Sequence, residues 1–307
     1  MSISGLELAE TRTIEKTGGR WAAFWELTKP RISAMVLISI VASGVVAANG
    51  VPGFWPLLHV AIGMFLVAAS GNALNMYLER YTDPLMPRTA RRPLPDRRLS
   101  ALDVLNFGAI TFGAGCSYLL TTLNWQTAVC AASTWVLYVF VYTPLKTRTW
   151  LNTEVGAVAG ALPIFSGALA TTGTLNWQAW SFFLVLVFWQ FPHFMAIAWL
   201  YREQYAAGGL QMLTVVDPSG RRAGRKAVFT AVAAWLCSLL PVAVIAPWWA
   251  GLVFALLSTV AAGIYFLASV RFQRETNDQT ARKLLRVSVL YLPLYMLLLV
   301  IFSRWFV

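Results

Sequence analysis

The chain has 307 residues, of which 58% are hydrophobic and only 12% are charged. Soluble domains carry about 25% charged residues, so this composition, with a mean hydropathy of +0.62, excludes an ordinary soluble domain. It indicates a protein with several membrane-spanning segments. The net charge of +11 does not indicate nucleic-acid binding, because the basic residues are scattered among short polar segments.

Apolar stretches near the roughly 20 residues that cross a bilayer core recur along the chain. Because every backbone group in lipid must be hydrogen-bonded within its own segment, they are predicted to be helices rather than strands. We predict nine spans, at 32–50, 56–78, 101–121, 126–143, 154–172, 178–200, 227–247, 249–270 and 285–303. The predicted fold class is an all-α polytopic membrane protein, with a cytoplasmic N-terminal tail (1–31) and a single transmembrane domain (32–307).

Basic residues set the predicted orientation. When every second connection is counted from the N-terminal segment, all of the 24 Lys and Arg residues except Arg304 fall on one side. By the positive-inside rule that side is cytoplasmic. The N-terminus is therefore expected in the cytoplasm and the C-terminus on the opposite side.

The second predicted span ends in the polar sequence NMYLERYTD. Asn75, Glu79 and Asp83 are four residues apart, so they are expected to share one face of a helix over two turns, with Asn72 one turn earlier. Ionisable groups at membrane depth are functional candidates by default. One amide and two carboxylates suit Mg²⁺, which is commonly held by carboxylates together with substrate phosphates. The alternative is that the two carboxylates simply end the span.

Arginines follow in the same loop, at Arg88, Arg91 and Arg92. A guanidinium group binds phosphate oxygens bidentately, so these residues suit a diphosphate held by the metal ion. The positive-inside rule accounts for them equally well. The chain has no Gly-rich phosphate loop, so a nucleotide is not indicated.

Two later segments on the same side are also unusually polar. VYTPLKTRTWLNT contains Tyr142, Lys146 and Arg148, and WQFPHFMAIAWLYREQY contains His193 beside a proline that is expected to kink the span. His193 could equally be a hydrogen-bonded core residue. Three polar clusters at one end of apolar helices predict a central pocket, open toward the cytoplasm, with a metal–diphosphate end and an apolar interior. An isoprenyl diphosphate has that shape.

These segments resemble the UbiA-type intramembrane prenyltransferases. The N-x-x-x-[DE]-x-x-x-D pattern at 75–83 is similar to their first acidic motif. Within that superfamily, M-x-R-T-x-x-R-P-L and W-Q-x-P-H-F resemble the protoheme IX farnesyltransferase (heme O synthase) family, over about 29–217. The resemblance implies farnesyl transfer from farnesyl diphosphate to the 2-vinyl group of heme b with addition of water. It also implies the plasma membrane of a bacterium, or the mitochondrial inner membrane in a eukaryote.

The resemblance also implies residue roles. The residues that would hold Mg²⁺ are Asn75, Glu79 and Asp83, and those that would take part in catalysis are these three with Lys146 and His193. The residues that would bind substrate are Asn72, Arg88, Arg92, Tyr142, Arg148, Tyr201, Arg202, Glu203 and Tyr205. Glu79 replaces the family's more frequent Asp. Gln204 stands where an acidic residue usually precedes Tyr205, so a second Mg²⁺ is not predicted.

Three other functions fit parts of the sequence. The first is a prenyltransferase that acts on a quinone precursor or another aromatic acceptor. The second is a secondary transporter, although its polar residues should lie mid-span at broken helices. The third is a structural assembly factor for respiratory oxidases. The expected partners are membrane lipid, farnesyl diphosphate and heme b, with a heme A synthase or terminal oxidase as candidate recipient of the product.

Overall fold

The computed structural model describes residues 19–306, and its secondary structure is helical. The first half contains α1 (Arg20–Leu27), α2 (Pro30–Ala47), α3 (Phe54–Leu78), a 3₁₀ turn (Asp83–Leu85), α4 (Ala101–Thr122), α5 (Trp125–Val136), a π-helix (Leu137–Tyr142), α6 (Thr143–Leu145), α7 (Asn152–Ala161) and α8 (Pro163–Thr172). The second half contains α9 (Trp177–Leu200), α10 (Arg202–Ala207), α11 (Leu213–Val216), α12 (Arg221–Ser238), a 3₁₀ turn (Leu240–Val244), α13 (Trp248–Arg274), α14 (Asp278–Phe302) and a last 3₁₀ turn (Ser303–Trp305).

Nine helical segments within residues 19–306 are long and apolar enough to cross a membrane, as predicted. The seventh and ninth begin several residues before their predicted starts, at Arg221 and Asp278. Each extension carries charged residues, which hydropathy excludes from a span although they continue the helix outside the hydrocarbon layer. At its other end the helical structure reaches back to Arg20, inside the segment assigned to the N-terminal tail, because α1 buries Ala23 and Leu27 against α3.

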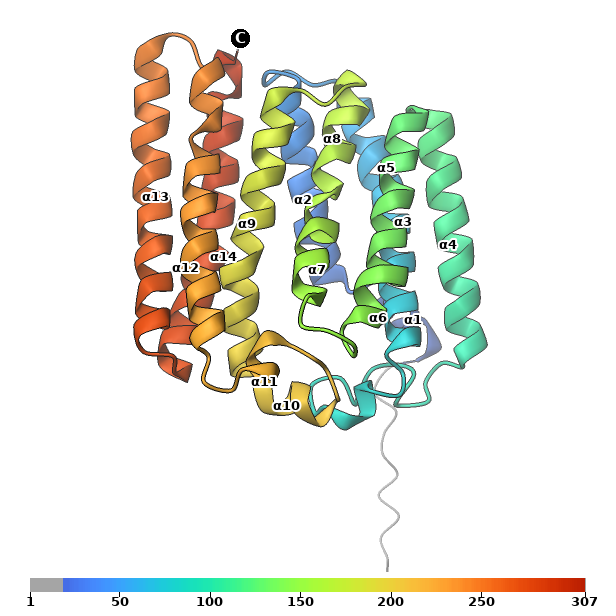
Figure 1. Cartoon of the computed structure of the whole chain (residues 1–307). Coiled ribbons are helices and arrows are strands. Elements are labelled where there is room, and N and C mark those ends of the chain that lie inside the picture. The colour runs from blue at the N-terminus through green and yellow to red at the C-terminus, as the bar shows by residue number, and fades with distance from the viewer. Residues whose placement is uncertain (1–18, 307) are drawn as a thin grey trace, which may run out of the picture.

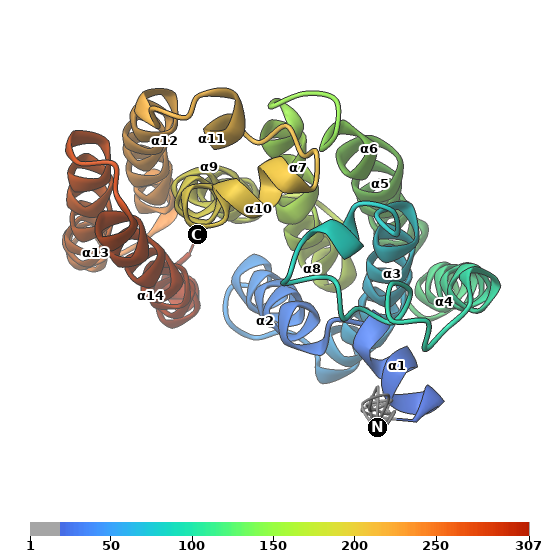
Figure 2. The same cartoon turned by 90° about the horizontal axis from the view of Figure 1, so that it is seen from below.

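The long helices run parallel to one axis, so that the connections gather at two opposite ends (Figure 1). Seen along that axis, α2, α3, α5, α7 with α8, α9 and α14 follow one another around the centre (Figure 2). Helix α4 packs outside α3, while α12 and α13 pack outside α9 and α14. The inner helices therefore supply the walls of any central site, and the outer ones support them.

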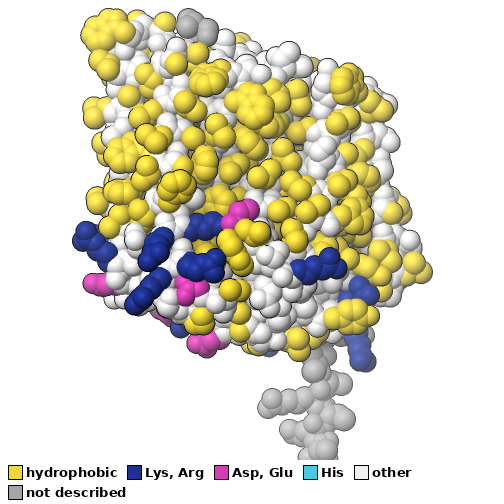
Figure 3. All heavy atoms as spheres, in the orientation of Figure 1, with side chains coloured by type: hydrophobic (Ala, Val, Ile, Leu, Met, Phe, Trp, Pro, Cys, Tyr) yellow, Lys and Arg dark blue, Asp and Glu magenta, His cyan; other side chains and the backbone are white. Residues whose placement is uncertain are grey.

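Charge separates the two ends of the bundle. In the view of Figure 3 the Lys, Arg, Asp and Glu side chains gather in the lower part of the molecule, and the surface above them is largely hydrophobic. We call the lower part, which contains the 79–100 loop, α10 and α11, the charged end (Figure 1). The C-terminus lies at the other end.

Candidate active site

The acidic motif does not lie on one continuous helix, which corrects the prediction of a shared helical face. Helix α3 ends at Leu78, Glu79 is its C-cap, and Asp83 opens a short 3₁₀ turn. Pro84 contributes to the break, because it has no backbone N–H with which to continue the α-helical hydrogen bonds. The motif still converges, since the backbone N–H of Asp83 donates to the carbonyl of Glu79 at 2.8 Å.

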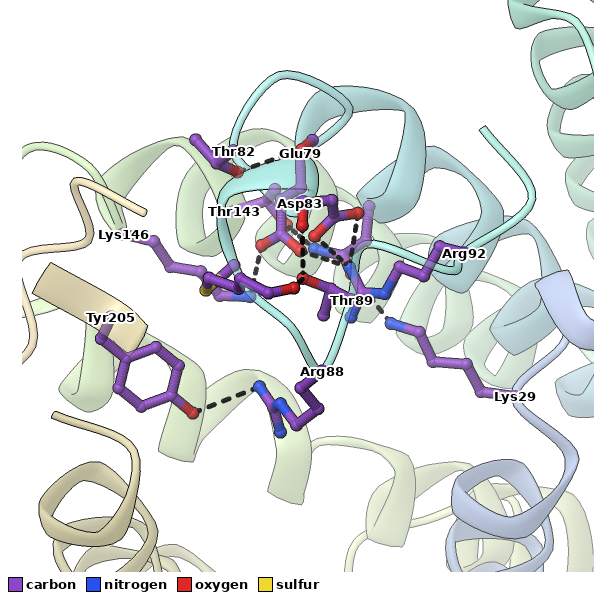
Figure 4. A network of polar contacts seen from close by, with 12 residues as sticks. Lys29, Glu79, Thr82, Asp83, Arg88, Thr89, Arg92, Thr143, Lys146 and Tyr205 are labelled. Atoms are coloured by element: carbon purple, nitrogen blue, oxygen red, sulfur yellow. Dashed lines mark hydrogen bonds and ion pairs between the residues drawn. The ribbon is translucent and has the colours of Figure 1, made fainter. Parts of the chain in front are cut away.

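Both carboxylates are ion-paired (Figure 4). Arg92 Nη1 donates to both oxygens of Asp83, at 2.7 and 2.8 Å, and to Oε2 of Glu79 at 3.1 Å. Lys146 Nζ donates to Oε1 of Glu79 at 2.6 Å. Asp83 has no solvent-exposed surface and Glu79 is 9% exposed. Two buried carboxylates therefore converge with cations from two different loops.

Asn75 joins the cluster through Lys29, which was not predicted as a site residue. Lys29 Nζ donates to Oδ1 of Asn75 at 2.9 Å, and Nδ2 of Asn75 donates to Thr143 Oγ1 at 3.2 Å. Lys29 has a left-handed backbone (φ 46°) immediately before Pro30. The Lys29-Pro30 pair at the start of the first span was the sequence feature that could have pointed to this residue. It was passed over because the positive-inside rule already explained a lysine at that position.

Asn72 supports the same region from one turn earlier on α3. Its Nδ2 donates to the Thr28 carbonyl at 3.0 Å and to Ser33 Oγ at 3.3 Å. These bonds tie α3 to the start of α2. They therefore help to position Lys29, whereas the substrate-binding role of Asn72 stays a prediction.

The protonation of the cluster follows from burial and mutual attraction. Burial opposes ionisation of Glu79, but the charges of Lys146 and Lys29 outweigh it and lower the pKa of Glu79 to about 2. Burial also opposes the positive charge on Lys146. The negative charge of Glu79 outweighs the effect of burial and raises the pKa of the Lys146 amine. Burial, reinforced by Arg92, lowers the pKa of Lys29 to about 7. Burial raises the pKa of Asp83 although Arg92 acts in the opposite direction.

The π-helix 137–142 supplies a second side of the site. Its Tyr138 and Tyr142 rings stack with centroids 5.6 Å apart, and the Lys146 amine lies 4.6 Å from the centroid of Tyr142. Such π-turns inside α-helices are frequent at functional sites. This one was not predicted, because its sequence is as apolar as any span.

A cavity of about 620 Å³ adjoins the cluster. Polar residues line its charged end, and they include Lys29, Asn72, Asn75, Arg92 and Lys146. The remaining lining is mainly apolar and aromatic and comes from α2, α3, α5, the π-helix, α7, α8, α9 and α14. The predicted combination of a charged end and an apolar interior is therefore present.

Arg88 is separate from the carboxylate cluster. It points away from Glu79 and Asp83 (Figure 4), and its Nη2 donates to the Tyr205 hydroxyl at 3.4 Å. Its guanidinium carbon lies 4.9 Å from the Tyr201 ring centroid. Burial raises the pKa of Tyr205, with the Arg88 charge opposing. The structure thus brings together the three predicted residues Arg88, Tyr201 and Tyr205 as a second group.

Three other predicted substrate-binding residues lie outside both groups, and their roles stay predictions. Arg148 is exposed. Arg202 donates to the Trp199 carbonyl and to Asp278, at the start of α14. The Glu203 side chain is 89% exposed.

His193 lies deeper in the bundle. Its Nδ1 is 2.8 Å from Ser288 Oγ on α14, and its ring stacks on Trp189 with centroids 4.9 Å apart. Helix α9 continues from Trp177 to Leu200 through Pro192.

The donor chemistry of the cluster fits magnesium. Asn75, Glu79 and Asp83 offer the carboxylate and amide oxygens that Mg²⁺ takes alongside phosphate. No group of three His, Cys, Asp or Glu side chains that could hold a metal occurs within 19–306. An all-protein cage is therefore not formed there, and substrate oxygens would have to complete the coordination.

Comparisons with known proteins agree with this geometry. The pattern of the UbiA prenyltransferase family matches residues 36–300. The chain belongs to the UbiA prenyltransferase family. It is 42% identical over 285 residues to a protoheme IX farnesyltransferase of Rhodopirellula baltica, covering 89% of this chain and 97% of the relative. It is 43% identical over 282 residues to a protoheme IX farnesyltransferase of Solibacter usitatus, covering 88% and 94%.

Solved structures of UbiA proteins share the fold. A digeranylgeranylglyceryl phosphate synthase structure has a TM-score of 0.78 at 17% identity, covering 93% of this chain and 99% of that chain. A UbiA homolog from Archaeoglobus fulgidus, bound to DMAPP and Mg²⁺, has a TM-score of 0.67 at 13% identity, covering 90% and 98%. The protein is therefore an integral membrane prenyltransferase of UbiA fold.

Proposed function

We propose that the protein transfers the farnesyl group of farnesyl diphosphate to the 2-vinyl group of protoheme IX (heme b), with addition of water, to give heme O and diphosphate. The relatives named protoheme IX farnesyltransferase support the choice of substrates. The observation that carries the proposal is the cavity itself, whose mainly apolar space ends at Lys29, Arg92 and Lys146. Glu79 and Asp83 lie beside this end and are paired with Lys146 and Arg92. That arrangement suits a long hydrocarbon with a diphosphate head.

The charged end stabilises the leaving group. As the C1–O bond of the farnesyl donor breaks, its electron pair stays with the diphosphate, so negative charge builds up there. When Lys29 is protonated, Lys29, Arg92 and Lys146 carry one positive charge more than Glu79 and Asp83 neutralise. Positioned cations of this kind are usually the largest single source of transition-state stabilisation.

Mg²⁺ would be held by Asn75, Glu79 and Asp83 and would supply Lewis-acid stabilisation of the diphosphate. Lys29, Arg92 and Lys146 occupy these oxygens in the structure. The three cations would therefore have to turn from these amide and carboxylate oxygens toward the phosphate oxygens when the metal–diphosphate complex binds. Long, flexible Lys and Arg side chains can do so without a backbone change.

The acceptor step takes place in the apolar part of the cavity. The terminal carbon of the 2-vinyl group bonds to C1 of the farnesyl cation, which leaves a cation on the inner vinyl carbon. Water adds there and loses a proton, giving the hydroxyethylfarnesyl group. The rings of Trp135, Tyr138 and Tyr142 line the cavity, and their π faces can stabilise the allylic cation.

The test is product formation by the purified protein. Heme b, farnesyl diphosphate and Mg²⁺ should give heme O, identified by mass spectrometry, and chelation of the metal with EDTA should abolish it. Glu275→Gln, which removes an exposed carboxylate outside the site, should retain activity. Prenylation of an aromatic acid without heme O would overturn the proposal in favour of a quinone-type acceptor, and transport without diphosphate release would indicate a transporter.

We propose the same membrane as the place of the product's next step. The farnesyl chain makes heme O strongly membrane-associated, so a heme A synthase or terminal oxidase in the plasma membrane of a bacterium, or in the mitochondrial inner membrane, could receive it directly. Recovery of such an enzyme with the protein after mild solubilisation would support direct transfer. Heme O that equilibrates freely with added vesicles before use would argue against it.

A further inference from the structure

His193 has one ring nitrogen fixed and the other free. Ser288 Oγ lies 2.8 Å from Nδ1 of His193 and 2.7 Å from the Leu285 carbonyl, to which it can donate its single proton. In that arrangement the serine accepts from Nδ1–H, and Nε2 keeps an unshared electron pair. Nε2 has no hydrogen-bond partner within residues 19–306, and the side chain is only partly buried.

The imidazole is held rigidly. Trp189 stacks on it, and Trp189 Nε1 donates to the Ser288 carbonyl at 2.8 Å. Tyr265, fully buried on α13, donates its hydroxyl to the Trp189 carbonyl at 2.8 Å. Two contacts thus fix the imidazole directly, one from the Ser288 hydroxyl and one from the Trp189 ring, and Tyr265 holds Trp189 in place. This support is the kind that orients metal-binding histidines, which typically donate the second ring N–H to a neighbouring oxygen.

His193 is also on the correct face. Leu186, Trp189 and Gln190 line the cavity from α9, and His193 is seven, four and three residues after them. Residues at these intervals share one helical face. On α14, Ser288 is one turn before Leu292, which also lines the cavity. Phe194, the residue after His193, lines the cavity as well, so the His193–Ser288 pair adjoins wall residues on both helices although neither side chain itself lines the cavity.

We infer that Nε2 of His193 binds the iron of the heme acceptor as an axial ligand. Neutral imidazole is a common metal ligand and the usual proximal ligand of haem. Iron coordination would fix the porphyrin to the α9–α14 wall, whereas the diphosphate site lies on α2, α3 and the loops after α3 and α6. The two substrates would thus bind to different walls of one cavity. This inference rests on the proposed function.

The experiment is a heme titration without farnesyl diphosphate. Purified protein should give the absorption and resonance Raman signature of histidine-ligated heme. His193→Gly should lose that signature, and added imidazole should restore it, which separates a lost ligand from a misfolded protein. The chain has two histidines, so the other one provides the matched control. His59 lies near the start of α3 and is hydrogen-bonded to Tyr118 of α4. His59→Gln should keep the signature.

Two further measurements make the inference sharper. Metal-free protoporphyrin IX keeps the vinyl and propionate groups but has no iron, so it should bind at least about tenfold more weakly than heme, and this difference should vanish in His193→Gly. Ser288→Ala should keep the histidine signature but weaken heme binding about tenfold, because Nδ1 loses its acceptor.

Several outcomes would overturn the inference. A histidine signature that survives in His193→Gly, or equal affinities of the wild-type protein for heme and protoporphyrin, would exclude iron ligation. Unchanged heme binding with loss of the hydroxylated product would assign His193 as the base that deprotonates water. Heme O synthesis is assayed in parallel, so a wild-type protein that forms heme O without a histidine signature refutes the ligand but not the proposed function.

Discussion

Asp83 is the residue at which charge matters most. It has no exposed surface, and both its oxygens accept from one nitrogen of Arg92. Asp83→Asn keeps the size of the side chain but removes its negative charge. We expect farnesyl transfer to fall at least about 100-fold, as when other charge-stabilising groups are removed from active sites, while membrane insertion is retained. Turnover and size-exclusion profiles of the two proteins check this, and near-normal turnover would remove Asp83 from the metal site.

Lys29 tests whether the cations and the metal ion compete for the same oxygens. Lys29→Met frees Oδ1 of Asn75 and removes a positive charge. Without diphosphate we expect Mg²⁺ to bind roughly tenfold more tightly, about 1.4 kcal/mol. The Mg²⁺–diphosphate complex should bind more weakly, because one phosphate ligand is lost. Isothermal titration of each measures both effects.

The matched control for this change is Lys283→Met, which removes an exposed charge on α14. It should leave both affinities unchanged. If Lys29→Met weakens the binding of metal alone as much as that of the complex, the cations do not compete with the metal, and Lys29 serves to hold Asn75 in place.

At the scale of elements, the spans could be predicted because lipid imposes one simple rule. All nine predicted spans correspond to helices, and the errors lie at charged ends such as Arg221 and Asp278. The convergence of Asn75, Glu79 and Asp83 was also predicted, but for the wrong reason. The α-helix stops at Leu78, and the backbone bond from Asp83 to the Glu79 carbonyl, together with the shared ion pairs to Arg92, brings the two carboxylates together. Contacts between distant segments, such as Lys29 with Asn75, leave no periodic signal in the sequence.

The crossing of α2 and α8 depends on the absence of a side chain. A Cβ on Gly167 would lie 2.0 Å from the Ile40 carbonyl oxygen and 3.0 Å from the Gly44 nitrogen, and both are backbone atoms. Gly167→Ala must therefore separate two helices that line the cavity. We expect a loss of about 3 kcal/mol or more in stability and weaker binding of both substrates.

Melting temperature and substrate titration of the variant check this expectation. The matched control is Gly263→Ala on α13, where nothing lies within 4 Å of the added carbon. Alanine there should be neutral or stabilising by up to about 1 kcal/mol, because it is the better helix former. Equal melting temperatures for the two variants would show that the α2–α8 crossing can readjust.

The loop that carries Arg88 and Arg92 is anchored by Arg98. Arg98 is 9% exposed in its side chain and donates to Glu26 at 2.6 Å, to the Arg91 carbonyl at 2.7 Å and to Asp96 at 2.9 Å. Arg98→Met removes all three bonds. Hydrogen bonds to charged groups contribute about 1.5–3 kcal/mol each, so amide exchange in 83–99 should accelerate about tenfold or more.

Hydrogen exchange with mass spectrometry measures this acceleration, and farnesyl diphosphate binding should weaken in parallel. Arg97→Met, at the neighbouring exposed position, removes the same charge and serves as the control. Loop exchange that rises in Arg98→Met without any change in diphosphate affinity would show that Arg92 is held by Asp83 and Glu79 alone.

For the whole molecule, orientation decides how the donor reaches the site. Farnesyl diphosphate carries several negative charges, and charged groups are costly to move through a bilayer core. It must therefore enter from the side that the charged end faces. The distribution of Lys and Arg predicts that this side is the cytoplasm. A reversed protein would present its diphosphate site to a compartment without access to the cytoplasmic donor pool.

Cysteine labelling tests this orientation. Cys116, Cys130 and Cys237 are first replaced by alanine, and one cysteine is then introduced at an exposed position. Ser219→Cys lies between α11 and α12 at the charged end, and Thr174→Cys lies between α8 and α9 at the other end. In intact cells a membrane-impermeant maleimide should label Thr174→Cys, and Ser219→Cys only after permeabilisation. The reverse pattern would place the charged end outside and would require an external source of farnesyl diphosphate.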